Sequence, residues 1–95
     1  MRKITKNEDF IDVLSGEISL IKSVKYYTHL DPDNKITPIL TTEDLAVTAR
    51  IPSSQLANLK SGQLCCEIEL QSIDEAFDDG TYDTIINDSL EVWLA

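Results

Sequence analysis

The stretch Gln63–Ser72, with the sequence QLCCEIELQS, constrains the fold of this chain more than any other segment. Small or apolar side chains occupy every second position, and mostly polar side chains lie between them. This two-residue period is typical of a β-strand with one buried face and one solvated face. The buried face is expected to hold Leu64, Cys66, Ile68, Leu70 and Ser72, and the polar face Gln63, Cys65, Glu67, Glu69 and Gln71.

The two cysteines of the chain lie side by side in this stretch. Cys65 and Cys66 would point to opposite faces of a strand, and a disulfide between adjacent residues is strained. A zinc site needs about four ligands, and the chain adds only one histidine, His29, to the two thiols. We therefore predict that Cys66 is buried in the core and that Cys65 is a half-exposed, unreactive thiol.

A second half-buried strand is predicted just before this one. In the segment Leu45–Pro52 apolar side chains again alternate with small or polar ones, and the closing proline ends the strand. Residues 53–60 then predict a short helical turn, capped by a serine at its start, with Leu56 and Leu59 facing inward.

The N-terminal half has weaker patterns. Residues 3–14 predict two short strands around a turn at Asn7-Glu8. Residues 18–30 fit a helical period in their first part and a strand period in their second part. Their β-branched and tyrosine side chains favour a strand, and a helix stays open. Residues 29–35, HLDPDNK, predict a loop, because proline, aspartate and asparagine favour turns.

The C-terminal third predicts a hairpin. Asp79-Gly80 is a turn signal, and extended segments rich in β-branched and aromatic residues follow at Tyr82–Ile86 and Leu90–Leu94. Asn87-Asp88, between the two segments, predicts either a second turn or a bulge.

Together these elements predict one all-β domain over residues 1–95. Strands recur about every ten residues with turns between them, which is typical of an antiparallel β-sandwich. The chain has no apolar leader and no run of about 20 apolar residues, so we expect a soluble protein that is made in the cytosol and does not enter a membrane.

The net charge of −9 comes from one part of the chain. Residues 1–60 balance their acids and bases, whereas residues 61–95 carry nine acids and no lysine or arginine. Nucleic acid is therefore excluded as a partner, because phosphate binding needs a basic surface. The expected interaction patch is acidic and consists of Glu67, Glu69, Asp78, Asp79 and Asp83.

Motifs for catalysis and for metal binding are weak. A calcium loop starting at Asp31 would place Ile36 where glycine is required and Thr42 where glutamate is required. The segment Asp78–Asp83 could hold a cation, although a plain hairpin turn is the better interpretation. The sequence contains no phosphate-binding loop and no Ser/His/Asp arrangement. We therefore expect no catalytic residues, no metal ligands and no cofactor, and a protein that is not an enzyme.

Several short motifs resemble a known family. Lys3–Phe10 is similar to the opening of small immunoglobulin-like domains in phage tail and baseplate proteins, including those of Bacteroides-type phages and prophages. Ala49–Pro52, Leu56, Leu59, Ser61–Leu64 and Glu67-Ile68 resemble the strand–turn–strand of these domains, and Asp79–Tyr82 and the final apolar strand follow in order. Glu8 and Leu64 depart from the family pattern, which has glycine and an aromatic residue at these positions.

The resemblance implies an immunoglobulin-like sandwich that acts through protein contacts within a virion or tail assembly, with self-association into a homo-oligomer. Two other functions stay open. One is an acidic regulatory protein that mimics nucleic acid or binds a basic partner. The other is a calcium-binding adhesive domain.

Overall fold

The computed structural model describes residues 1–14, 21–43, 46–73 and 81–95. These residues form strands and one helical turn. In chain order the elements are β1 (Arg2–Ile4), β2 (Phe10–Leu14), β3 (Ile21–Thr28), β4 (Asp31–Ile36), β5 (Ile39–Glu43), β6 (Ala46–Ile51), α1 (Ser53–Leu56), β7 (Gly62–Ile73) and β8 (Thr81–Leu94). Within these ranges no helix is long and apolar enough to span a membrane.

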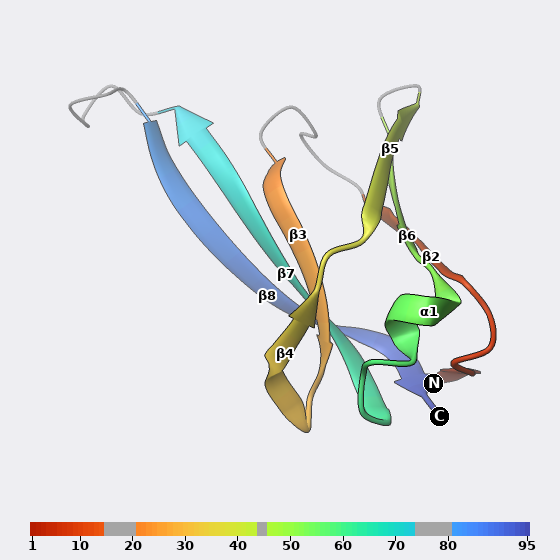
Figure 1. Cartoon of the computed structure of the whole chain (residues 1–95). Helices are drawn as coiled ribbons and strands as arrows, with labels where there is room; N and C mark the ends of the chain where they lie inside the picture. The colour runs from red at the N-terminus through yellow and green to blue at the C-terminus, as the bar shows by residue number, and fades with distance from the viewer. Residues whose placement is uncertain (15–20, 44–45, 74–80) are drawn as a thin grey trace.

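The strands form two sheets that pack as a sandwich (Figure 1). The larger sheet has the order β1-β8-β7-β3-β4, and the smaller one has the order β2-β6-β5. The predicted all-β sandwich is thus confirmed. The pairing is antiparallel except between β1 and β8, which run parallel. The predicted immunoglobulin-like topology stays a prediction.

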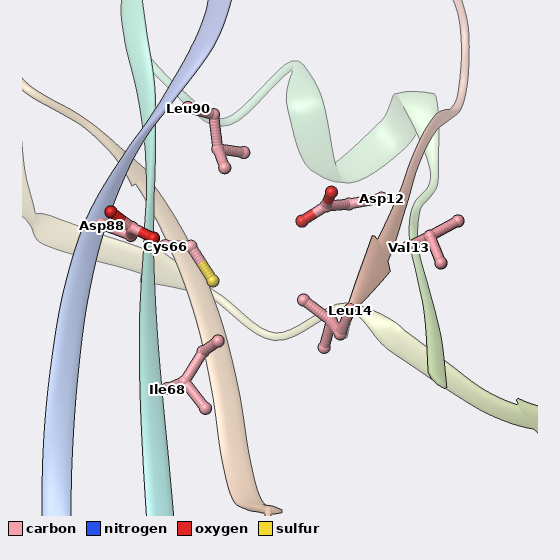
Figure 2. A pocket seen from close by; sticks show the side chains of 7 residues that line it. All are labelled: Asp12, Val13, Leu14, Cys66, Ile68, Asp88 and Leu90. Carbon is pink, nitrogen blue, oxygen red and sulfur yellow. The ribbon is translucent and has the colours of Figure 1, made fainter. Parts of the chain in front are cut away.

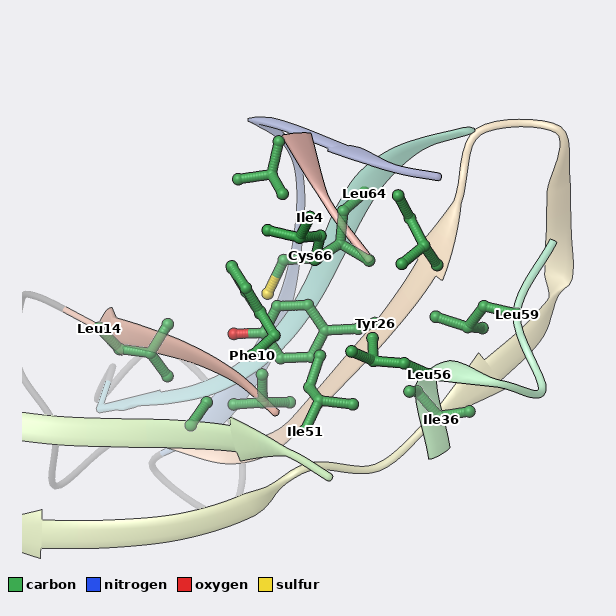
Figure 3. Packing of buried hydrophobic residues seen from close by; sticks show 14 of the residues in the cluster. Ile4, Phe10, Leu14, Tyr26, Ile36, Ile51, Leu56, Leu59, Leu64 and Cys66 are labelled. Atoms are coloured by element: carbon green, nitrogen blue, oxygen red, sulfur yellow. The ribbon is translucent and has the colours of Figure 1, made fainter. Parts of the chain in front are cut away.

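The core lies between the sheets and around α1 (Figure 3). Tyr26 of β3, Ile51 of β6 and Leu64 of β7 are fully buried there. Apolar burial of this kind supplies the main stabilising free energy of the fold. The other buried members of this cluster are Ile4, Phe10, Leu14, Val24, Ile36, Val47, Ala49, Leu56, Leu59, Cys66, Val92 and Leu94.

The two central strand predictions are confirmed. Leu64 and Cys66 of β7 are buried between the sheets, and Ile68 packs against the same core. In β6 the alternate residues Val47, Ala49 and Ile51 are buried, and the strand ends before Pro52 as expected.

The helical turn is also confirmed, but its predicted serine cap is wrong. Leu56 and Leu59 are buried as expected. The N-cap position is Pro52, which has no side-chain hydrogen bond. Instead, the backbone N–H of Ser53 donates to Oδ1 of Asp9 at 2.9 Å. A carboxylate from the loop before β2 therefore satisfies a free N–H group of the first turn.

In the N-terminal half, the turn at Asn7-Glu8 separates β1 from β2 as predicted. These two strands then enter different sheets. The strand favoured for residues 18–30 is confirmed by β3 from Ile21 onward, and residues 18–20 lie outside the described part.

The loop predicted for residues 29–35 is wrong from Asp31 onward, because this segment forms β4. Within the described part of the chain, β4 is an edge strand whose one partner is β3. Pro32 lacks a backbone N–H and would disrupt a central strand, but an edge strand tolerates it.

The two C-terminal segments form one continuous strand, β8. Asn87 and Asp88 lie in the regular ladder opposite Glu67 and Cys66, so the predicted turn or bulge at this place is wrong. The register shifts closer to the C-terminus, between the pairs Cys65–Ser89 and Gln63–Trp93. The predicted turn at Asp79-Gly80 lies outside the described residues.

Candidate functional site

The acidic side chains predicted to form a patch can be placed for three of the five residues. Glu67 and Glu69 of β7 and Asp83 of β8 occupy the outer face of the larger sheet, with Asp83 opposite Gln71. Asp78 and Asp79 lie outside the described residues. The structure therefore brings Glu67, Glu69 and Asp83 onto one face, as the strand period predicted for the first two.

A lysine that sequence reasoning missed joins this face. Lys22 Nζ lies 2.9 Å from Oδ2 of Asp83 and 3.8 Å from Oε1 of Glu69. The hydrogen bond to Asp83, followed by the attraction of its carboxylate, raises the pKa of Lys22. Since all three side chains are partly exposed, the ion pairs contribute little stability. They do neutralise part of the acidic face.

A β-bulge in β3 directs Lys22 outward. Ile21 pairs with Leu70 and Ser23 pairs with Glu69, so one extra residue of β3 lies between successive pairs. Without the bulge, strict alternation from Val24 would turn Lys22 toward the core. Lys25, the next base of β3, lies opposite Glu67. The sheet thus brings bases from the first half of the chain beside the acids of the second half.

Cys65 is buried, with only 5% of its surface exposed, so the prediction of a half-exposed thiol is wrong. Its neighbours across the outer face are Tyr27 of β3 and Ser89 of β8, whose Oγ lies 3.8 Å from the thiol. The Tyr27 hydroxyl also donates to Oδ1 of Asn87 at 3.2 Å, across the width of β7. These cross-strand contacts shield Cys65 on a face that the period alone predicts to be solvated.

A pocket of about 200 Å³ lies between the sheets (Figure 2). Its polar lining residues are Asp12 of β2, Cys66 of β7 and Asp88 of β8. The hydroxyl of the buried Tyr26 donates to Oδ2 of Asp12 at 2.7 Å, which links the two sheets. The apolar lining residues are Val13, Leu14, Ile68 and Leu90.

The chemistry available in this pocket is limited. Burial raises the pKa of the Cys66 thiol to about 11, so the thiol is protonated at neutral pH and is a weak nucleophile. Ligand pockets usually measure roughly 300–1,000 Å³, above the size of this one. Among the described residues, no group of three or more His, Cys, Asp or Glu side chains could hold a metal ion.

The raised pKa of Cys66 predicts a loss of stability at alkaline pH. Because the thiol ionises near 9.0 when unfolded and near 11 when folded, its contribution is complete below pH 9 and is lost as the pH rises toward 11. We expect the free energy of unfolding to fall by about 1 kcal/mol between pH 8 and pH 10. Urea titrations at several pH values measure this slope. A Cys66→Ala variant should have a flatter slope, and an unchanged slope would contradict the prediction.

Comparison with protein-family models and curated proteins gives no relative that could assign the site. The chain matches no protein-family model and no curated protein. Its function must therefore be inferred from its own residues and geometry.

Proposed function

We propose that the chain is a non-enzymatic interaction module, an immunoglobulin-like sandwich that belongs to a phage-derived tail or baseplate assembly. The two-sheet sandwich and the family motifs at Lys3–Phe10 and Ala49–Pro52 support this proposal. The protein is made in the cytosol and joins the particle there through protein contacts. It needs no cofactor, and neither nucleic acid nor a membrane is its partner.

The observation that carries the proposal is the exposed middle of β8. Ile85 and Ile86 are 58% and 42% exposed, although both lie within a long strand of the larger sheet. Apolar side chains on a strand at a sheet edge favour contact with another protein chain.

The interleaved bases of β3 favour this function over nucleic-acid mimicry. Such a mimic needs a continuous run of negative charge. Here Lys22 binds Asp83, and Lys25 lies opposite Glu67. The acidic outer face is thus partly neutralised by the chain itself.

Co-purification with phage particles tests the proposal. We expect the chain to be found by mass spectrometry in the tail fraction of particles induced from its host. An Ile85→Lys variant should be incorporated at about a tenth of the wild-type level, which corresponds to about 1.4 kcal/mol of lost contact. The matched control is Thr41→Lys, because Thr41 is an exposed threonine of β5. This variant should be incorporated at the wild-type level. Absence of the wild-type chain from purified particles would refute the proposal.

A further inference from the structure

β8 has a free edge along most of its length. β1 pairs only with Val92–Leu94, and in the described ranges no strand pairs with the same side of Thr81–Glu91. The unpaired N–H and C=O groups of such an edge are a template for a further strand. This stretch contains neither proline nor lysine, the residues that usually prevent edge pairing.

The other sheet edges are shorter or protected. β4 carries Pro32 and Lys35, and β5 directly follows Pro38. β1 has three residues and β2 has five. Edge-to-edge association is therefore most favourable along Thr81–Glu91.

Resting on the proposed function, we infer that two copies of the chain pair through these edges, antiparallel and about a twofold axis at Ile86. Overlap of the two free stretches favours this register, because Ile86 is the midpoint of Thr81–Glu91, and the central pairs from Asp83 to Ser89 lie where β8 keeps a regular register with β7. β1 covers the edge from Val92 onward and so stops the second copy from sliding further. Two exposed Ile86 side chains then meet at the axis and bury each other.

The residue pairs in this register are complementary. Asp83 lies opposite Ser89 and Asp88 lies opposite Thr84, each between one copy and the other. No two acids face each other in this register. Hydroxyl groups can donate to the facing carboxylates, whereas opposed carboxylates would repel.

Neighbouring registers are less favourable. A symmetric antiparallel pair keeps equivalent faces together, so the strands can slide only in steps of two residues. A slide in either direction shortens the overlap of the two free stretches by two residues. One direction sets Asp83 opposite Glu91 of the second copy, and the other sets Ile86 opposite Thr84. Only the register centred on Ile86 combines complete overlap with complementary pairs.

The dependence on salt follows from the net charge. Two chains that each carry a net charge of −9 repel each other at long range, although no two acidic residues face each other in the contact itself. Added salt screens the repulsion, so we expect the dimer to become tighter as ionic strength rises. A basic partner on the same edge would show the opposite dependence.

Sedimentation of the full chain tests the pairing. Wild type should shift with concentration from its protomer mass of 10.6 kDa to twice that mass. Thr84→Asp sets one acid against Asp88 of the other copy at each of the two equivalent positions and should weaken the dimer about tenfold. The exchange Thr84→Asp with Asp88→Thr restores complementary pairs at the wild-type charge and should restore the affinity. Thr41→Asp adds the same charge as Thr84→Asp away from the edge and should have little effect.

Cross-linking tests the register directly. Opposed residues of an antiparallel pair have Cα atoms about 4.5–5.5 Å apart, within the range of a disulfide. Ile86→Cys should therefore join two copies on mild oxidation. Thr84→Cys should not, because the two copies of residue 84 lie four residues apart along the strands.

Three results would overturn the inference. They are a wild-type monomer at every concentration, equal effects of Thr84→Asp and Thr41→Asp, and no disulfide dimer of Ile86→Cys. If the wild type stays monomeric but is incorporated into particles, the proposed function stands and the self-pairing fails. If it dimerises but is absent from particles, the self-pairing stands and the proposed function fails.

Discussion

Replacement of Tyr26 by alanine is expected to lower the free energy of unfolding by about 3–5 kcal/mol. Tyr26 is fully buried in β3, at the centre of the core between the sheets. Its removal leaves a cavity that the surrounding strands can fill only in part. A domain of this size is stable by roughly 5–14 kcal/mol, so the variant should lose a large fraction of the stability of the fold.

Tyr26→Phe separates the ring from the hydroxyl. The ring keeps its packing, and Asp12 Oδ2 loses the hydroxyl donor at 2.7 Å. Because Asp12 lines the pocket and is only half-buried, water can solvate its carboxylate. We expect a cost of about 1 kcal/mol, near the net value of one hydrogen bond.

Urea denaturation followed by far-UV circular dichroism measures both variants. Tyr27→Ala is the matched control, since Tyr27 is the next residue of β3 and lies half-buried on the outer face. Its loss should cost clearly less than the loss of Tyr26. Equal costs for the two alanine variants would show that the core does not centre on Tyr26.

One shared feature made β6 and β7 predictable from sequence. Both strands have one face against the core and one face toward solvent, so the buried face imposes a two-residue period on the sequence. β7 was predicted through Leu64, Cys66 and Ile68, and β6 through Val47, Ala49 and Ile51. A two-residue period in the local sequence is sufficient to predict a strand when one face of that strand is buried in the core.

The edge strands lack such a pattern. β4 buries only Ile36, and its proline and asparagine favour a loop in any local analysis. β5 was missed for a similar reason, because Ile39 and Leu40 are both largely exposed. Edge strands owe their conformation to hydrogen bonds with a neighbouring strand rather than to a buried face of their own, and the sequence period does not record these bonds.

The acidic patch was predictable only in part. The period placed Glu67 and Glu69 on one face, but Lys22 enters it through a bulge and from 61 residues away from Asp83. The burial of Cys65 depends in the same way on Tyr27 and Asn87, which meet across β7. Both corrections come from tertiary contacts on a face that the sequence alone describes as solvated.

Replacement of Gly62 by alanine is the second change with a large expected effect. Gly62 begins β7 with φ at 154°, a conformation that residues with a Cβ rarely adopt. A Cβ at this position would lie 2.9 Å from Nδ1 of His29. We expect a loss of about 2–3 kcal/mol in the free energy of unfolding, from backbone strain together with this contact.

The His29 ring cannot easily move aside. Its Nδ1 accepts a hydrogen bond from the N–H of Gln63 at 2.9 Å, and its centroid lies 5.7 Å from that of Trp93. The backbone N–H of His29 also donates to the carbonyl of Gln63 at 3.0 Å. A methyl group on Gly62 would therefore disturb the contacts that hold the β3–β4 turn against the start of β7.

A double-mutant cycle with His29→Ala separates the cost of Gly62→Ala into backbone strain and the contact with the His29 ring. In that background the ring contact is absent, and Gly62→Ala should cost only the backbone strain, about 1 kcal/mol. Ser61→Ala, at the exposed preceding residue, should change stability by less than about 0.5 kcal/mol. An equal cost of Gly62→Ala with and without the His29 ring would assign the whole effect to the backbone. A cost below that of Ser61→Ala would refute both causes, because neither strain nor contact would then favour glycine at the start of β7.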